Sequence, residues 1–271
     1  IALATAVAVW AGVTIVRAHP IDWEAYQTGE KELGIVDERE FWTLAVGREL
    51  TDPPRYAEDF LGSKLMQNWE DALEDAIDAD AAQLNLAYVS AEPELYSWYY
   101  RDREDEESDL SNLPLTAYLI NLGMTSMNAP LDVRILDTVG LATPIAARMP
   151  RDPKGRVGHD KFLDPAWQAA DTDTYLDGLP PFISSMRAKQ ARAALRSPEI
   201  SELLATSREP MSWERFWKNV RYSLSDGRTL QLSSDPGLYI DTDTRRAIRR
   251  GANPGMDGAQ LAWPVEAHAR K

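Results

Sequence analysis

The chain has 271 residues, of which 44% are apolar and nine are tryptophan, and its formal net charge is −14. This composition is typical of a packed globular core and excludes a disordered chain. The negative charge would repel a phosphate backbone, so we expect no nucleic-acid partner, and it also disfavours docking on anionic lipid headgroups. Because the chain has no cysteine, disulfides, thiol catalysis and zinc–thiolate sites are excluded.

The first eighteen residues, Ile1–Ala18, are apolar and carry no charge before Arg17. As a helix they would extend about 27 Å, close to the ~30 Å hydrocarbon core of a bilayer. The chain does not begin with Met and continues directly into charged sequence. We therefore expect residues 1–18 to be the end of a last transmembrane helix and residues 19–271 to be one extracytoplasmic soluble domain. The alternatives are an ordinary buried helix and a signal peptide, although the second lacks a basic start and a small-residue cleavage site.

The acidic composition favours the non-cytoplasmic side of a membrane, because cytoplasmic flanks usually carry an excess of Lys and Arg. Beyond the first segment, two helices are predicted. Residues 37–50 begin with acids and continue with apolar residues at helical spacing, so Asp37 is the expected start. A second helix is expected from about Pro54 to Ile77, where a Pro-Pro pair is followed by one apolar stripe.

Two strands are predicted next. Residues 83–90 alternate between apolar and polar side chains, and residues 95–101 are rich in aromatic side chains. Six of the eight residues 102–109 are acids, which predicts a solvated loop or hairpin tip. Calcium binding by this acidic run is the more specific alternative.

Residues 115–122 and 131–136 are predicted to be buried strands. The second leads through Asp137 into a short helix that ends at Arg148. A strand, a loop and a helix in this order are typical of α/β proteins. We therefore predict an α/β fold, or a mixed α+β fold, with a small central sheet and flanking helices, preceded by the end of the transmembrane helix.

The second half of the chain is predicted to be helical from about residue 180. Ser212 is the expected N-cap of one of these helices, with Glu214 in its first turn. Residues 163–178 are expected to be loop or short helix, residues 229–232 a short strand, and the tail from Gly251 irregular. The predicted helices cover residues 182–195, 198–205 and 212–224.

The sequence GRVGHDK at residues 155–161 is a candidate site, because His159, Asp160 and Lys161 are consecutive after a glycine-containing loop. An aspartate can orient a histidine and raise its basicity, as in general-base catalysis. The alternative is that His159 only fixes the loop through backbone hydrogen bonds. Asp137 follows a predicted strand, where ligands of α/β sheets gather, and it can equally cap the helix that follows.

Two Asp-x-Asp pairs resemble the divalent-ion motifs of nucleotide-sugar glycosyltransferases. Asp241 and Asp243 precede a helical pattern, so helix capping is the preferred interpretation. Asp171 and Asp173 lack the sixth-position glycine of an EF-hand loop, and for them capping and solvation are also preferred. We therefore predict no metal site.

Aromatic side chains are candidates for sugar contacts, because flat rings cover the apolar faces of sugars. Trp98, Tyr99 and Tyr100 are adjacent, so in a strand they cannot all point inward and at least one is expected to be exposed. We nominate Trp98 as a sugar contact, with core packing as the alternative. Trp213 and Trp217 are four residues apart on a predicted helix and are expected to lie in the core.

Four stretches taken together resemble a known family. They are residues 34–39 (GIVDER), 121–130 (NLGMTSMNAP), 136–144 (LDTVGLATP) and 155–161 (GRVGHDK). Their order is similar to that in the C-terminal region of actinobacterial terminal β-(1→2)-arabinofuranosyltransferases, and to proteins labelled as ZomB-type flagellar motor control proteins. The resemblance covers roughly residues 30–180.

The resemblance implies a polytopic membrane glycosyltransferase of the GT-C class that takes arabinofuranose from a decaprenyl-phosphate carrier and adds it to the ends of cell-wall arabinan. Its C-terminal domain would face the periplasm and cap the membrane part. The implied partners are the arabinan or arabinogalactan acceptor, the lipid-linked donor and the transmembrane part of the same protein. The family's catalytic carboxylate lies in an early extracytoplasmic loop outside this chain, so we nominate no catalytic residue, and no cofactor is implied.

The motif residues carried over as acceptor- or interface-contacting positions are Asn128, Asp137, His159, Asp160 and Lys161. The leading hypothesis is a cap domain that binds or guides the acceptor and is inactive alone. The alternative is a structural or interaction domain that stabilises its membrane partner and binds no sugar. A third hypothesis, a free-standing hydrolase that uses His159 and Asp137, requires both side chains to share one cleft.

Overall fold

The computed structural model describes residues 2–17, 38–104, 113–155 and 158–251. The chain divides into two compact units, residues 1–42 and 43–271, which we treat separately. Helix α1 (Ala2–Arg17) accounts for most of the first predicted segment. Among the described ranges, no helix has both the length and the apolar character needed to cross a membrane. Asp37, most of the acidic run and the tail after Gly251 lie outside the described residues.

The two helices predicted before the sheet are shorter than expected. Helix α3 (Glu38–Ala45) ends two residues before Gly47, which has a positive φ of 73°. The segment from Pro54 to Ile77 is not one helix, and this prediction is wrong. It forms two 3-10 helices, η1 (Ala57–Gly62) and η2 (Lys64–Met66), and then helix α4 (Trp69–Asp78).

The break before α4 has a tertiary cause. Asn68 has a left-handed backbone with φ 53°. Its side-chain amide donates to the carbonyl oxygen of Trp98 (3.1 Å) and accepts from the Trp98 N–H (2.9 Å) in strand β2 (Glu94–Arg101). This tie to the sheet interrupts the helix, although the apolar spacing of the sequence continues through it.

Four strands form one sheet in the order β2-β1-β3-β4. Strand β1 (Gln83–Ala91) pairs antiparallel with β2, which confirms the two predicted strands. Strand β3 (Thr116–Tyr118) lies parallel to both β1 and β4 (Arg134–Leu136). Strands β3 and β4 are both shorter than predicted. After β3 the chain enters helix α5 (Leu122–Met127). The small sheet with flanking helices confirms the predicted mixed α/β fold.

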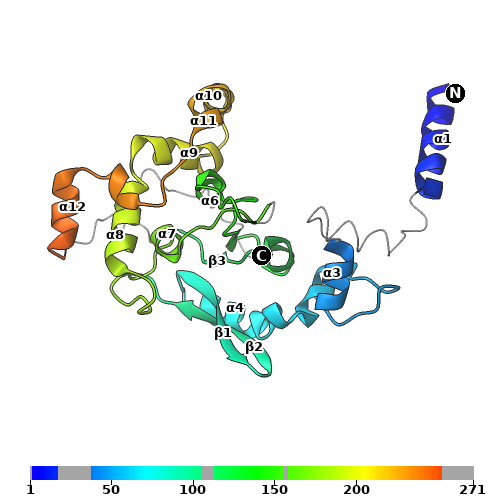
Figure 1. Ribbon diagram of the computed structural model, residues 1–271, viewed down its shortest axis with the longest axis horizontal. Coiled ribbons are helices and arrows are strands. Elements are labelled where there is room, and N and C mark those ends of the chain that lie inside the picture. The colour runs from blue at the N-terminus through cyan, green and yellow to red at the C-terminus, as the bar shows by residue number, and fades with distance from the viewer. Residues whose placement is uncertain (1, 18–37, 105–112, 156–157, 252–271) are drawn as a thin grey trace, which may run out of the picture. The chain divides into compact units, whose positions relative to one another are not determined.

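The described part of the chain after β4 contains helices and irregular segments but no further named strand, and the helices expected beyond residue 180 are present (Figure 1). The expected strand at 229–232 is absent from this part; its first residue ends a short helix and the rest is irregular. Ser212 is the N-cap of α10, as predicted, and its Oγ accepts from the Arg215 N–H (3.1 Å). The helices are α6 (Pro144–Arg148), α7 (Pro165–Ala170), α8 (Ser185–Ala194), α9 (Pro198–Arg208), α10 (Trp213–Leu224), α11 (Asp226–Thr229), η3 (Pro236–Tyr239) and α12 (Thr242–Arg249).

The main core lies where α6, α7, α8 and α9 pack together beside β3. Its largest fully buried side chains include Ile145, Leu163, Trp167, Ile200 and Leu204. Each such side chain contributes about 1.5–3 kcal/mol when it is removed from water. This core fixes the position of α6 and of the loop that follows it.

A buried ion network crosses the same core, and it contradicts the expected solvation of the first Asp-x-Asp pair. The carboxylate of Asp171 is buried and accepts from Arg208 Nη2 (2.7 Å) and from the Tyr118 hydroxyl (3.0 Å), and it lies 3.6 Å from Arg134 Nη1. Asp173 is buried as well. The second pair behaves as predicted, because Asp241 caps α12 through the N–H groups of its second and third residues.

Candidate functional site

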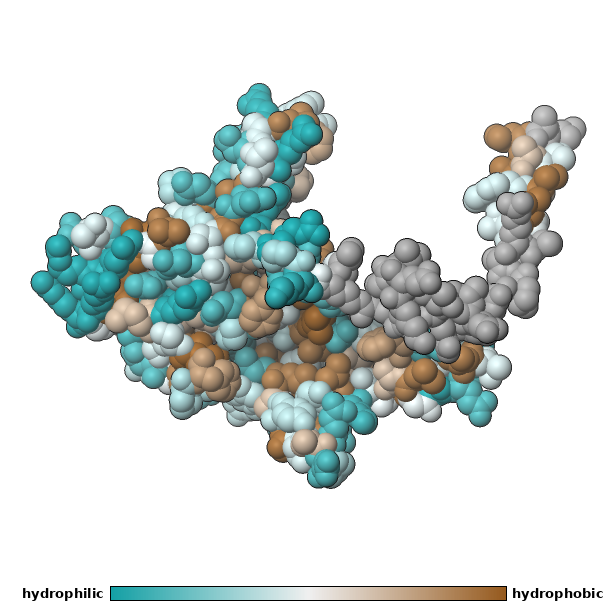
Figure 2. Space-filling model, in the orientation of Figure 1, coloured by the Kyte–Doolittle hydropathy of each residue, from teal (hydrophilic) through white to brown (hydrophobic). Residues whose placement is uncertain are grey.

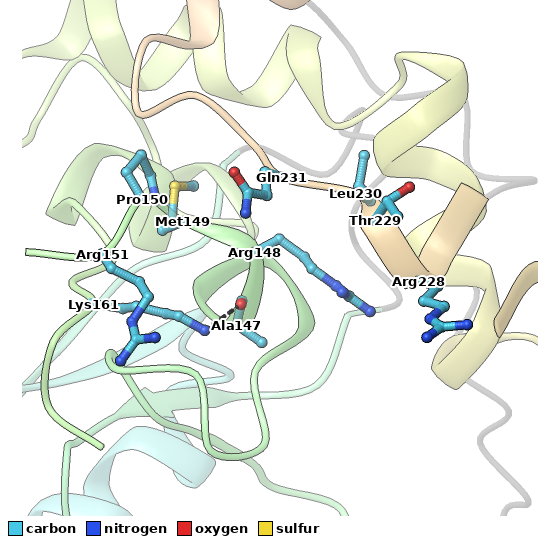
Figure 3. Close-up of a pocket in the computed structure, with 10 residues that line it drawn as sticks. All are labelled: Ala147, Arg148, Met149, Pro150, Arg151, Lys161, Arg228, Thr229, Leu230 and Gln231. Atoms are coloured by element: carbon cyan, nitrogen blue, oxygen red, sulfur yellow. Dashed lines mark hydrogen bonds between the residues drawn. The ribbon is translucent and has the colours of Figure 1, made fainter. Parts of the chain in front are cut away.

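A cavity of about 410 Å³ opens between the end of α6, the loop that follows it, and the end of α11 with the two residues after it (Figure 3). Four of its described lining residues are cations: Arg148, Arg151, Lys161 and Arg228. None of the described lining residues is acidic, although the whole chain carries a net charge of −14. The remaining walls come from Ala147, Met149, Pro150, Thr229, Leu230 and Gln231.

Two segments far apart in sequence meet at this cavity. Arg148 is the last residue of α6, and its backbone oxygen accepts a hydrogen bond from the Leu232 N–H (2.8 Å). Leu232 is itself buried in the main core. This pairing holds residues 228–231 beside the end of α6, so the cavity is built on packed elements.

The motif residue Lys161 is positioned by the carbonyl at the end of α6. Its Nζ donates to the Ala147 oxygen (2.7 Å), at the negative end of that short helix (Figure 3). Figure 3 shows the head groups of Lys161 and Arg151 on one side of the cavity, while the Arg148 side chain extends towards the side that carries Arg228. The ammonium group of Lys161 has three N–H donors, and this bond occupies one of them.

Asp160 orients the neighbouring arginine. Its carboxylate accepts a hydrogen bond from Arg151 Nε, and this bond, with the charge of Arg151, holds the pKa of Asp160 below its usual value. A backbone hydrogen bond closes the loop, in which the Asp152 N–H donates to the backbone oxygen of Asp160 (2.6 Å). Asp160 therefore holds Arg151 at the rim, while Lys161 points into the cavity.

This lining presents hydrogen-bond donors with positive charge. Guanidinium and ammonium groups bind phosphate and carboxylate oxygens, and they also donate to neutral hydroxyl oxygens. The volume lies within the range of small-molecule sites. The cavity is therefore suited to an oxygen-rich ligand such as a sugar, a phosphate or both.

The structure brings three predicted residues to this region and places three elsewhere. Lys161 lines the cavity, Asp160 supports its rim, and His159 is an exposed residue on the same loop. Asn128, Asp137 and Trp98 are not among the described lining residues. Nothing observed tests whether any of the six contacts a substrate, so that assignment stays a prediction.

Asp137 organises the loop before α6. It is fully buried, and its two carboxylate oxygens accept the backbone N–H groups of residues 139–143. Burial raises the pKa of Asp137, but these N–H groups outweigh it and hold that pKa below its usual value. The hydrolase hypothesis required Asp137 to share a cleft with His159. Because Asp137 is fully buried and bound to five amides while His159 is exposed, that condition is not met.

Asn128 and Trp98 make structural contacts. The Asn128 side chain donates to the carbonyl oxygens of Ala57 (2.8 Å) and Met124 (2.9 Å). Trp98 is buried against Trp69 at 4.6 Å between ring centroids, and its Nε1 donates to the Leu65 oxygen (2.7 Å). The Asn128 bonds join α5 to η1, and the Trp98 bond ties η2 to strand β2. Tyr99 and Tyr100 are exposed, which confirms that at least one member of the aromatic run faces solvent.

Sequence reasoning missed Arg148, Arg151 and Arg228. The first two flank a proline at the end of a predicted helix, and this spacing is too ordinary to single them out. Arg228 lies 67 residues beyond Lys161, and only the folded chain brings it to the same cavity.

Comparison with known proteins places this region in a family. The family model described as "AftB family C-terminal domain" matches residues 62–242. The terminal β-(1→2)-arabinofuranosyltransferase of Corynebacterium glutamicum is 42% identical over 263 residues, which cover 95% of this chain and 36% of that protein. The protein of the same name from Mycobacterium tuberculosis is 40% identical over 108 residues, which cover 39% of this chain and 17% of that protein. No solved structure matches the chain significantly.

Proposed function

The chain belongs to the AftB C-terminal domain family, and from this premise we propose that it serves the transfer of arabinofuranose to arabinan. The proposed donor is decaprenyl-phosphate arabinose, and the proposed acceptor is the end of cell-wall arabinan. The chain spans 36% of the Corynebacterium glutamicum relative, so we assign the chemical step to a part of the longer protein outside this domain. The domain alone is expected to transfer no sugar.

We place the domain at the cell membrane on its periplasmic side, next to the transmembrane part of the same protein. Two observations support this placement. Described residues of α1 before Arg17 are uncharged, and the chain carries 43 acids against 29 basic residues. Cytoplasmic flanks of membrane helices usually carry an excess of Lys and Arg, and this composition has no such excess.

The basic cavity is the proposed site for the acceptor glycan. The observation that carries this proposal is Lys161, a residue of the family-like motif whose ammonium group points into the cavity beside Arg151. Sugar hydroxyls accept hydrogen bonds from such groups, and the apolar walls at Met149 and Leu230 can cover the ring carbons.

A second ligand is favoured by one specific feature of the cavity. Four cations, with no acid among the described lining residues, suit a negatively charged group better than a neutral one. In the proposed reaction, that group is the phosphate of the lipid carrier. The structural alternative, in which the domain only supports its membrane partner, predicts that neither ligand binds.

The test is a transfer assay with separate kinetics for the two substrates. This chain replaces the matching region of the Corynebacterium glutamicum relative, and Lys161→Met and Arg228→Met are introduced together. Lys154→Met, an exposed lysine outside the cavity lining, is the matched control. Loss of two charge-assisted bonds is expected to raise the acceptor KM about tenfold or more.

Each outcome separates the candidates. A rise in the acceptor KM with an unchanged donor KM supports acceptor binding in the cavity. A rise confined to the donor KM assigns the cavity to the carrier phosphate. Unchanged values for both substrates support the structural alternative. Transfer by the isolated chain would refute its expected inactivity.

A further inference from the structure

Helix α10 is packed with its polar side against the protein. Arg215 is buried, and its guanidinium donates to Glu209 (2.9 Å) and Asn219 (2.8 Å) and pairs with Glu202 (2.5 Å). The Asn219 side chain donates to the Thr206 oxygen of α9 (2.9 Å). A surface helix normally packs its apolar stripe inward, so α10 is inverted.

The apolar stripe of α10 therefore faces outward, and the predicted core positions of Trp213 and Trp217 are wrong. The exposed fractions are 78% for Trp213, 42% for Phe216, 52% for Trp217 and 74% for Leu224. These positions fall on one side of a helix, because their spacings of three, four and eleven residues repeat its turn. Figure 2 shows brown side chains among teal ones on the projecting segment that Figure 1 labels α10.

The rings contact one another without being covered. Phe216 lies edge-on to Trp213 at 5.7 Å and to Trp217 at 5.2 Å between ring centroids. Three adjoining exposed aromatic rings on one helix are unusual for a surface that only meets water. The stripe therefore marks an interaction surface.

Cations flank this stripe. Lys218 and Arg221 are exposed on α10, and Arg228 is exposed on the adjoining α11. Glu214 is the one acid of α10, and Lys218 pairs with it at 3.1 Å, while α11 carries one exposed acid, Asp226. An exposed apolar stripe with tryptophans, bordered by Lys and Arg, has the composition of helices that lie in a membrane interface.

We propose that α10 docks with this stripe in the interfacial layer of a bilayer that contains anionic lipids, with its axis in the membrane plane. The aromatic rings and Leu224 enter the boundary between headgroups and acyl chains, and Arg221 meets lipid phosphates. The charge next to the stripe is thus complementary to the lipid, although the chain as a whole is acidic. A second copy of the chain fits less well, because it would bring the same cations together. This inference does not rest on the proposed function.

The absence of cysteine makes a site-specific probe possible in the full chain. Leu224→Cys carries a nitroxide spin label, and Leu238→Cys on η3, also an exposed leucine, is the matched control. Vesicles of phosphatidylcholine with phosphatidylglycerol are added, and collisions with oxygen and with a water-soluble nickel chelate are measured. We expect the label at 224 to gain oxygen collisions and lose nickel collisions, while the label at 238 stays accessible to nickel.

This readout separates α10 from α1, which can hold the chain on a vesicle by itself. Phe216→Ser with Trp217→Ser should abolish the change at 224, while Phe182→Ser, at another exposed phenylalanine, should leave it intact. Circular dichroism confirms that each variant is folded. The proposal is overturned if the label at 224 stays in water, if the aromatic substitutions leave its immersion unchanged, or if it is shielded without vesicles by spin–spin contact between two copies.

Discussion

Replacing Asp171 by Asn should strongly destabilise the domain. The substitution keeps the side-chain shape but removes the negative charge that Asp171 places beside Arg208 Nη2 (2.7 Å) and Arg134 Nη1 (3.6 Å). All three side chains are buried, so two guanidinium groups would remain in the core without a counter-charge. Breaking a buried pair in this way costs about 3–5 kcal/mol.

Thermal unfolding followed by far-UV circular dichroism measures this loss. For a domain of this size, about 1 kcal/mol lowers Tm by roughly 2–4 °C, so Asp171→Asn should lower it by roughly 6–20 °C. The matched control is Asp241→Asn at the exposed N-cap of α12, where Asn caps about as well as Asp and Tm should hardly change. A loss below about 1 kcal/mol at Asp171 would refute the assigned role of the network.

The pH dependence gives a second check on Asp171. Burial raises its pKa, but the charges of Arg208 and Arg134 outweigh burial and hold the pKa of the folded state below the ordinary 3.8. Because the pKa of Asp171 is lower in the folded state, its charge contributes fully to stability above the pKa of the unfolded state. This contribution is lost as the pH falls through the pKa of the folded state. The stability difference between wild type and Asp171→Asn should therefore be constant from neutral pH to about pH 4 and shrink below it. A difference that grows on acidification would contradict this sign.

Three further substitutions test the local geometry by urea unfolding. Gly140→Ala should cost about 2–4 kcal/mol, because φ is 89° and a Cβ would lie 2.4 Å from the backbone of α6. The control Gly123→Ala, where a Cβ would meet no atom within 4 Å, should stabilise the domain by up to about 1 kcal/mol. Asp137→Ala removes the acceptor of five backbone N–H groups and should cost about 2–4 kcal/mol, and a neutral result would show that water replaces it. Asn68→Ala should cost about 1–3 kcal/mol through its two bonds to Trp98, and Asn68→Asp should also destabilise, because a carboxylate oxygen would face the Trp98 carbonyl oxygen.

The sequence predicted the parts of the fold that local pattern determines. Residues 83–90 alternate between apolar and polar side chains, which is a local property of a strand. Ser212 caps α10 through a hydrogen bond from the N–H of Arg215, three residues later. The family resemblance was likewise readable from four short stretches, and the comparisons confirm it.

Features that depend on tertiary contacts were not predictable in the same way. The helix expected from Pro54 to Ile77 is broken by the bonds between Asn68 and Trp98, which lie thirty residues apart. Asp171 was expected to be solvated because its partners Arg134 and Arg208 are distant in sequence. The stripe of α10 has the spacing of a core face, but the buried pairing of Arg215 and the bond from Asn219 to Thr206 turn it outward.

The candidate site was predicted in part for the same reason. Lys161 was found through the motif, because its neighbours in sequence single it out. The three arginines that complete the cavity come from the end of α6, the next loop and α11. The sequence does not show that these arginines share one cavity. The hydrogen bond from the Leu232 N–H to the Arg148 oxygen brings the segment of Arg228 next to the end of α6.

Acceptor binding by the cavity is the central claim, and a titration of the chain with short arabinofuranose oligosaccharides tests it most directly. Backbone NMR signals report where the sugar binds, and Lys161→Met is compared with wild type. We predict saturable shifts at residues 147–151 and 228–231, with affinity reduced about tenfold by the substitution. Absence of binding up to millimolar sugar, or shifts confined to the exposed tyrosines of the β1–β2 hairpin, would contradict the claim.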